Sequence, residues 1–429
     1  MASFILLIFL GLMGIGVPIG FAMGLTALFG FFKVGDPALL TMLPQRFFSA
    51  MDSFSLLALP FFFLAGDIMN KVGLSERLIE FCDVLFGRLR GGLAQVSIVA
   101  SVIFGGISGS AVADIAALGS IFIPAMKKEG YDEEFSAALA VAASIIAPII
   151  PPSIIMVIYG ALMGVSIAGL FAAGVVPGLL IALGLMIITR FISGKRGYPK
   201  REEKPSFRKI VRATGRASWA LFMPIIILGG ILAGIVTPTE AAAVAVGYAL
   251  MVGFFVFRTL TLKDFYRLLF QGSIMMGIIA LIMSSASVLA WLLASEQVPE
   301  MVAKGFLSVS KDKFVVLLLV NVFLLIIGTL MDITAALIIL APILAPLAIS
   351  QGVHPLHFGI LMCVNLNIGL MTPPVGGSLF TVTAITGIDM WRITRQMWPF
   401  VLVEVGVLLL ITYVPEITLF VPKLLGFYN

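Results

Sequence analysis

The sequence predicts an all-α membrane protein with many spans, and three observations support this. The 429 residues are 60% hydrophobic and only 11% charged, with a mean hydropathy of +1.14, whereas about 25% of the residues in a soluble domain are charged. The apolar runs are long and continuous, which excludes the period-two pattern of an outer-membrane β-barrel. Gly and Pro interrupt several runs at corresponding places in two halves of the chain.

The apolar runs give the expected elements in chain order. They lie at about 3–32, 54–69, 92–107, 113–126, 135–163, 168–192, 217–236, 239–257, 273–294, 314–330, 333–349, 357–386 and 398–422. A spanning helix needs about 20 apolar residues, so several runs are too short to cross the bilayer alone. The first run is too long for a signal peptide and has no basic segment before it. We therefore expect it to remain as a membrane helix.

Positive charge is concentrated in one loop, at residues 195–216. This loop holds nine Lys or Arg residues and two Glu residues, a local charge of +7 in a chain whose net charge is +5. A short basic loop between two membrane runs is a topology signal and not a nucleic-acid site, and the positive-inside rule makes it cytoplasmic. It divides the chain into a first half, 1–194, and a second half, 217–429.

Each half contains two short apolar runs around a polar, Gly-containing break. Residues 92–126 enclose FGGISGSAVAD, and residues 314–349 enclose IGTLMDITA. Backbone groups freed by such breaks are tolerated in a membrane only where they are buried in protein or line a cavity. Both segments are therefore predicted to be re-entrant hairpins.

Each hairpin is followed by a long apolar run with a double proline. Pro151 and Pro152 interrupt the run at 135–163, and Pro373 and Pro374 interrupt the run at 357–386. Proline removes a backbone amide and clashes with the preceding turn. Both helices should be broken at mid-length.

A constant offset of 222 residues superposes the two halves. It pairs Gly106 with Gly328, Pro124 with Pro346, Gly130 with Gly352, Pro151 with Pro373, and Pro152 with Pro374. Interrupted segments at corresponding places in two halves are typical of secondary transporters, whose sites lie at the interface of the repeats. The usual arrangement is an inverted repeat, with hairpins that enter from opposite sides.

The motifs of common enzymes are missing from the sequence. There is no Walker A, HExxH or GxSxG pattern. The two histidines, His354 and His357, lie in HPLHFG, and the two cysteines, Cys82 and Cys363, are far apart, so neither pair predicts a metal site or a disulfide. We expect no enzymatic activity and no nucleic-acid partner.

The offset also pairs polar residues at the predicted hairpin tips, Ser110 with Asp332. An intramembrane aspartate costs roughly 2.5 to 3.5 kcal/mol and marks a functional site by default. Asp332 and Asp114 are expected to be buried carboxylates of this kind. The alternative for each is a helix N-cap.

Broken helices expose carbonyl ends, which suit a small hard cation, and amide ends, which suit a carboxylate. Two sodium sites are predicted, the first at Ser108, Ala147, Ile150 and Pro152 and the second at Gly328, Gly369, Thr372 and Pro374. The predicted substrate-binding residues are Ser108, Ser110, Asp332 and Asn365. Two alternatives stay open: Thr372 either binds sodium or bonds a carbonyl one turn back, and Asn365 and Asn367 either line a polar path or bond a neighbouring helix.

Three segments carry a family resemblance. FGGISGSAVADIAALGSIFIPAMKKEGYDEEFSAALAVAASIIAPIIPPSI, TPTEAAAVAVGYAL and HFGILMCVNLNIGLMTPPVGGSLF resemble the large membrane subunit of tripartite ATP-independent periplasmic (TRAP) transporters, over nearly the whole chain. The resemblance implies a sodium-coupled importer of organic acids in a bacterial inner membrane. N-acetylneuraminate is the favoured substrate and C4-dicarboxylates come next.

The resemblance also implies the partners and the mechanism. A periplasmic binding protein delivers the substrate, and a small four-helix membrane subunit, expected as a separate chain, supports the large one. A transport domain moves like an elevator against a scaffold. The alternative is a channel, because Gly-rich re-entrant hairpins also build pores, but channel filters surround a symmetry axis of subunits, whereas here two different hairpins lie in one chain.

Overall fold

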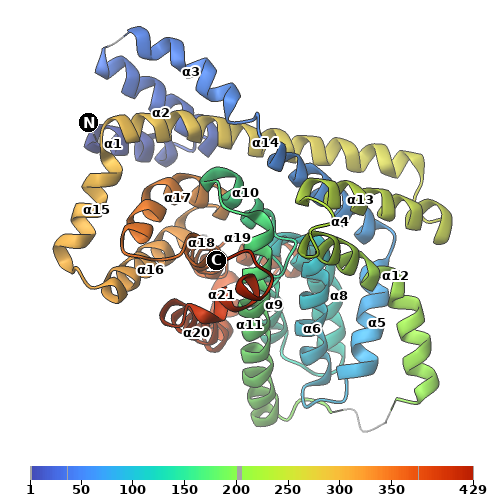
Figure 1. Cartoon of the computed structure of the whole chain (residues 1–429). Helices are drawn as coiled ribbons and strands as arrows, with labels where there is room; N and C mark the ends of the chain where they lie inside the picture. The colour runs from blue at the N-terminus through green and yellow to red at the C-terminus, as the bar shows by residue number, and fades with distance from the viewer. Residues whose placement is uncertain (1, 36, 201–204, 375, 429) are drawn as a thin grey trace.

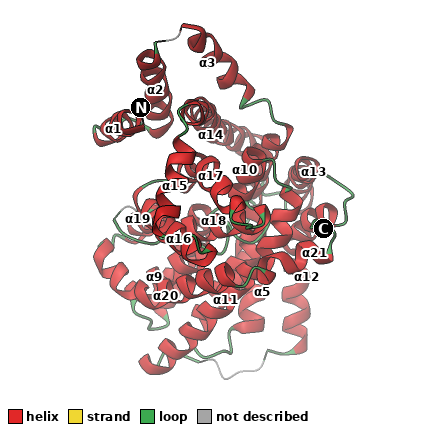
Figure 2. Cartoon of the chain, turned by 60° about the vertical axis from the view of Figure 1, so that its left-hand side comes forward, coloured by secondary structure: helices red, strands yellow, loops and turns green. Residues whose placement is uncertain are grey.

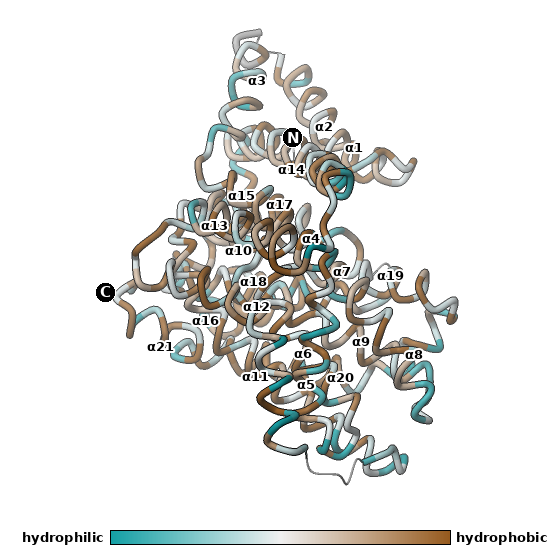
Figure 3. The backbone as a smooth tube through the Cα atoms, turned by 90° about the vertical axis from the view of Figure 1, so that its right-hand side faces the viewer, coloured by the Kyte–Doolittle hydropathy of each residue, from teal (hydrophilic) through white to brown (hydrophobic). Residues whose placement is uncertain are grey.

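The computed structural model describes residues 2–35, 37–200, 205–374 and 376–428, and all regular structure in these residues is helical (Figures 1 and 2). Eight of the described helices are long and apolar enough to cross a membrane. Hydrophobic residues follow the middle of the helices, and hydrophilic residues gather at helix ends and connections (Figure 3). The predicted all-α, multi-spanning fold is confirmed.

The first half contains the helices up to the basic loop. They are α1 (Ala2–Gly14), α2 (Ile19–Val34), α3 (Pro37–Ser49), α4 (Ala58–Lys71), α5 (Leu74–Phe86), α6 (Gly92–Ser108), α7 (Ala111–Asp114), the π-helix η2 (Ile115–Gly119), α8 (Ser120–Lys128), α9 (Glu133–Ser144), α10 (Ile154–Met163) and α11 (Ile167–Arg196). A short 3-10 helix, η1 (Phe54–Leu57), precedes α4.

The second half follows the basic loop. Its helices are α12 (Phe207–Leu232), α13 (Pro238–Met251) with the π-helix η3 (Val252–Val256), α14 (Leu262–Ser295), α15 (Val298–Val309), α16 (Lys313–Leu330), α17 (Ile333–Ser350), α18 (Pro355–Leu370), α19 (Gly377–Thr386), α20 (Met390–Tyr413) and α21 (Glu416–Leu424).

The helix boundaries repeat with the offset read from the sequence. α16 begins 221 residues after α6, α17 begins 222 after α7, and α19 and α20 begin 223 after α10 and α11. Gly and Pro therefore mark the same architecture twice. The predicted breaks at 108–110 and 330–332 separate α6 from α7 and α16 from α17.

The two halves pack on each other reciprocally. α10 of the first half contacts α17 of the second, and α19 of the second contacts α7 and η2 of the first. In the same way α9 packs on α20 while α18 packs on α11, and α4 packs on α13 while α2 packs on α14. Each of these three contacts recurs with the halves exchanged, as an approximate twofold axis requires. α17, α18 and α19 lie near α10 in the middle of Figure 1.

A polar network joins three helices at the end of α11 that leads into the basic loop. Arg196 donates to Asp132 Oδ2 (2.8 Å) and to Gln396 Oε1 (2.6 Å), and Tyr198 donates to the same Asp132 oxygen (2.6 Å). Arg392 pairs with Glu134 nearby. Burial, with the hydrogen bond to Asp132, raises the pKa of Tyr198. The network ties the start of α9 to α11 and to the start of α20.

Candidate functional site

The tip of the first hairpin rests on the first helix break. Gly109 follows α6 with a φ of 60°, and a Cβ built on it would lie 2.5 Å from the carbonyl oxygen of Pro152. Only glycine tolerates both the left-handed conformation and this close approach. Ser110 then caps α7 and accepts a hydrogen bond from the amide of Ala113 (3.4 Å). The tip and the double proline are in direct contact.

The first predicted sodium site is partly assembled by this contact. One turn before the tip, a Cβ on Gly105 would lie 2.6 Å from Cα of Ala147. The Ser108 hydroxyl is buried and has no hydrogen-bond partner among the described residues. Ile150, by contrast, packs its side chain against Gly178 of α11. Ser108 thus lies in the stretch between Gly105 and Gly109, which contact Ala147 and Pro152, and its hydroxyl oxygen has no partner among the described residues.

The second hairpin tip has the same capping geometry with a different residue. Asp332 caps α17 and accepts hydrogen bonds from the amides of Thr334 (2.9 Å) and Ala335 (3.3 Å). Its side chain is exposed, so the prediction of a buried carboxylate is wrong for Asp332. The capping alternative is confirmed, because the chain turns at the tip and frees the amides of the next helix.

The second break brings two backbones together. A Cβ on Gly369 would lie 2.4 Å from the carbonyl carbon of Gly328. Thr372 is half-buried and donates its hydroxyl to the carbonyl oxygen of Ile368 (2.9 Å), which is the bond one turn back that the sequence left open. Pro374 is exposed. Because the hydroxyl oxygen of Thr372 only donates in this bond, its lone pairs are still free to coordinate a cation. The sodium role of Thr372 stays a prediction.

Asn365 lies apart from the tips. Its side chain donates to the carbonyl oxygen (3.0 Å) and the amide oxygen (3.1 Å) of Asn321 in α16, and Asn321 donates to Thr412 in α20 (2.9 Å). Asn367 donates to the carbonyl oxygen of Cys363 (2.7 Å) in its own helix. For Asn365 the structure favours the bond to a neighbouring helix over the polar path.

Two buried carboxylates complete the inventory of polar groups. Asp114 is 1% exposed and accepts a hydrogen bond from Ser101 Oγ (2.8 Å). Asp114 is the last residue of α7 and its side chain makes no capping hydrogen bond to η2, so the capping alternative for Asp114 is wrong. Glu404 of α20 is fully buried, and neither carboxyl oxygen has a partner within the described residues. Glu404 is not among the residues predicted from the sequence, although an acidic residue inside FVLVEVGVLLL is a signal of an intramembrane site.

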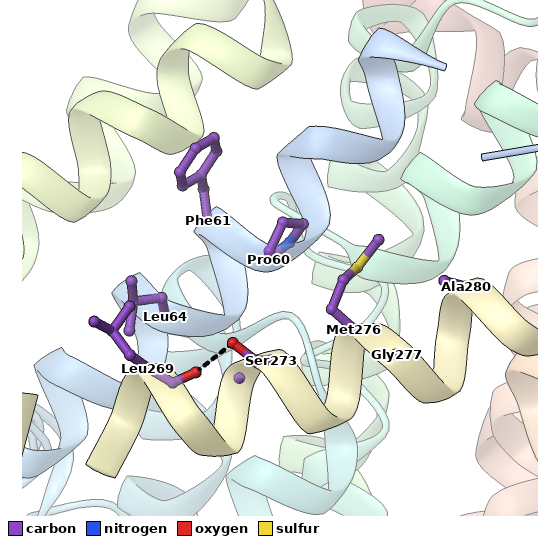
Figure 4. Close-up of a pocket in the computed structure, with 9 residues that line it drawn as sticks. Pro60, Phe61, Leu64, Leu269, Ser273, Met276, Gly277 and Ala280 are labelled. Carbon is purple, nitrogen blue, oxygen red and sulfur yellow. Dashed lines mark hydrogen bonds between the residues drawn. The ribbon is translucent and has the colours of Figure 1, made fainter. Parts of the chain in front are cut away.

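A hollow lies elsewhere, between α4 and α14 (Figure 4). It has a volume of about 350 Å³ and is lined by Pro60, Phe61, Leu64, Leu269, Gly272, Ser273, Met276, Gly277 and Ala280. Its one hydroxyl, on Ser273, donates to the carbonyl oxygen of Leu269 (2.8 Å). No predicted site residue lines this hollow, and its apolar wall offers nothing to an organic anion.

Paired hairpins seated on paired helix breaks give the architecture of a secondary transporter. The family model described as "Tripartite ATP-independent periplasmic transporter, DctM component" matches residues 6–417. The chain belongs to this family of TRAP large permease subunits, and the resemblance read from the sequence is confirmed.

Curated relatives agree with the family match. The chain is 42% identical to the isethionate TRAP transporter permease protein DctMQ of Oleidesulfovibrio alaskensis, over 95% of this chain and 64% of that one. It is 40% identical to the sialic acid TRAP transporter large permease protein SiaM of Vibrio cholerae, over 97% of both chains. It is 36% identical to the C4-dicarboxylate TRAP transporter large permease protein DctM of Rhodobacter capsulatus, over 97% of this chain and 98% of that one.

A solved structure shares the fold. The crystal structure of the Alcanivorax borkumensis YdaH transporter matches with a TM-score of 0.58 over 88% of each chain, at 16% sequence identity. At this identity the match concerns the fold alone. A helical bundle of this kind is thus known in another transporter.

Proposed function

We propose that this chain is the permease of a sodium-coupled importer of organic acids in a bacterial inner membrane. The observation that carries the proposal is the seat of each hairpin on a helix break, Gly109 on Pro152 and Gly328 on Gly369. At such a seat, backbone carbonyl and amide groups meet inside the bundle, where no lipid competes for them. The predicted inverted repeat and elevator movement belong to this proposal.

Sodium is the proposed coupling ion, with two or more bound per cycle. The buried hydroxyl of Ser108, unpartnered among the described residues, supports the first site, because the neighbouring Gly105 and Gly109 contact Ala147 and Pro152. The backbone contact of Gly328 with Gly369 supports the second, where Thr372 supplies a hydroxyl oxygen. Oxygen-only sites of this kind suit small hard cations.

The proposed substrate is an organic anion that meets both hairpin tips. Ser108 and Ser110 at one tip offer hydroxyl donors to the anionic group, and the exposed carboxylate of Asp332 at the other accepts hydrogen bonds from hydroxyl groups of the substrate. N-acetylneuraminate is the first candidate and a C4-dicarboxylate the second. The printed names of relatives add isethionate, also an anion, so all three belong in the assay.

Two partners are proposed, a small membrane subunit and a periplasmic substrate-binding protein. The family description calls the system tripartite. The relative named DctMQ contains sequence outside the matched part, since this chain covers 64% of it. We propose that a separate four-helix chain takes that role here.

Reconstitution tests the proposal. Proteoliposomes with this chain, the small subunit and the binding protein should take up labelled substrate only with an inward sodium gradient, and omission of either partner should abolish uptake. Uptake that is unchanged when choline replaces sodium contradicts the coupling. Ion currents far above carrier rates, without any gradient dependence of uptake, indicate a channel.

A further inference from the structure

The first hairpin, hairpin 1, runs from α6 to α8 and encloses the carboxylate of Asp114. One of the two carboxylate oxygens has no hydrogen-bond partner among the described residues. Asp114 is the last residue of α7, and the chain continues directly into the π-helix η2. The side chain is 1% exposed, and Ser101 of α6 donates to its Oδ2 atom at 2.8 Å. The two arms of the hairpin are thus joined through this carboxylate.

The second oxygen, Oδ1, has no hydrogen-bond partner among the described residues and no access to solvent. If Asp114 is ionised, one hydrogen bond supports a buried charge that no ion pair compensates in the described part of the chain. If it is protonated, Oδ2–H donates to Ser101 Oγ, whose own hydrogen then turns to a carbonyl of α6. In both states Oδ1 is left without a partner among the described residues, and a cation at Oδ1 satisfies it in the ionised state.

This carboxylate is not part of the repeat. With the offset of 222, Ala336 stands at the position of Asp114 and Phe323 at the position of Ser101. Hairpin 2 therefore folds with an apolar pair at this place. The polar pair in hairpin 1 is not needed to build a hairpin, and it lies outside the two predicted sites that the repeat relates.

Hairpin 1 also connects this pair with its tip. Ser101 lies one helical turn before Gly105, whose backbone meets Ala147, and Asp114 lies one turn after the Ser110 cap. A cation bound to Asp114 therefore stabilises the segment of hairpin 1 that holds the tip against the helix break.

We propose that Asp114 binds a sodium ion through Oδ1 inside hairpin 1, at a third cation position, with Ser101 as the residue that positions the carboxylate. A carboxylate with hydroxyl and carbonyl oxygens is a ligand set for a hard cation. The inference rests on the proposed sodium coupling and adds a site that only the first half carries.

The test uses the complex of this chain with its small subunit and compares sodium chloride with choline chloride. Thermal unfolding gives the sodium concentration for half-maximal stabilisation, and uptake with the binding protein gives the Hill coefficient for sodium. Asp114→Asn removes the charge with little change of shape, and Ser101→Ala removes the positioning bond. Ser97→Ala is the matched control, since Ser97 is also buried in α6 but bonds its own helix at the Ala94 carbonyl (2.9 Å).

Asp114→Asn should lower the Hill coefficient by about one, and Ser101→Ala should raise the stabilising sodium concentration roughly 10-fold to 100-fold, as loss of a group that orients a metal ligand does. Ser97→Ala should match the wild type. If both variants keep the wild-type sodium midpoint and Hill coefficient while wild-type uptake depends on sodium, the third position is refuted and a buried water or a neutral acid explains Oδ1. If wild-type uptake does not depend on sodium, the coupling itself fails.

Discussion

The two hairpins have corresponding helix boundaries but differ in the polarity and burial of their side chains. Nearly every residue of α6 is buried, and polar side chains such as Ser101 and Asp114 lie inside the first hairpin. The outer helix of the second hairpin, α16, instead exposes Leu318, Val322 and Ile326. Repetition therefore fixes where the chain turns, but the surroundings of each hairpin decide which side chains are buried there.

The comparison extends to the seats of the hairpins. In the first half Gly105 meets Ala147, which has a side chain, whereas in the second half Gly328 meets Gly369 and both lack one. The offset pairs Ala147 with Gly369, so the first half accommodates a Cβ at the position where the second half has no room for one. Substitutions at this pair of positions should therefore have unequal effects.

The largest effect is expected at the second seat. Gly369→Ala places a Cβ only 2.4 Å from the carbonyl carbon of Gly328, so one backbone must move. Overpacking of this kind costs about 1–3 kcal/mol, and more where backbone is the obstacle. Thermal unfolding of the purified protein should show a large loss of stability. Gly305→Ala in α15 is the control, because nothing lies within 4 Å of its added carbon; equal stability of the two variants would refute the tight seat.

The next effect concerns the exposed carboxylate at the second tip. Asp332→Asn keeps an oxygen that can cap α17, while Asp332→Ala removes the cap at a cost of about 1 kcal/mol. If the charge serves transport, both variants lose uptake, but only the alanine variant loses thermal stability. Wild-type uptake by Asp332→Asn would leave Asp332 with the capping role alone. Ser110→Ala is the matching change at the first tip.

A smaller, graded effect is expected at the second break. Thr372→Val keeps the shape and deletes one oxygen, and Thr372→Ser keeps the oxygen. The sodium concentration for half-maximal uptake should rise roughly 10-fold in the valine variant, as expected for a lost bond to a charged group, and less in the serine variant. An unchanged sodium requirement with lowered stability would mean that the bond to Ile368 is the whole role of Thr372.

The smallest effect is expected in the network at the end of α11. Tyr198→Phe removes the hydrogen bond that Tyr198 donates to Asp132 and the one that it accepts from Arg196 (3.2 Å), each worth about 1 kcal/mol of unfolding free energy. Because the folded protein raises the pKa of Tyr198, this contribution is complete below the unfolded value of about 10 and is lost as the pH rises through the folded value. Unfolding measured at pH 7 and pH 11 should show a difference between wild type and variant that shrinks at the higher pH.

The sequence predicted the scaffold well because Gly and Pro act on the backbone locally. The offset of 222 anticipated the helix boundaries, and it paired Ser110 with Asp332, which the structure shows to be the caps of α7 and α17. It did not predict burial, which depends on packing between distant helices. Asp332 is exposed for this reason, and Glu404 was overlooked because its counterpart in the first half, Ala182, carries no charge to draw attention.

Simultaneous fluxes of labelled sodium and labelled substrate test the central claim most directly, since the two hairpin seats are proposed to bind the ions that drive transport. In proteoliposomes with both partners, substrate entry should carry radioactive sodium with it in a fixed ratio of two or more. Ser108→Ala should lower the sodium influx and the substrate uptake together, with folded protein still in the membrane. Substrate uptake without accompanying sodium, in the wild type, would contradict the account.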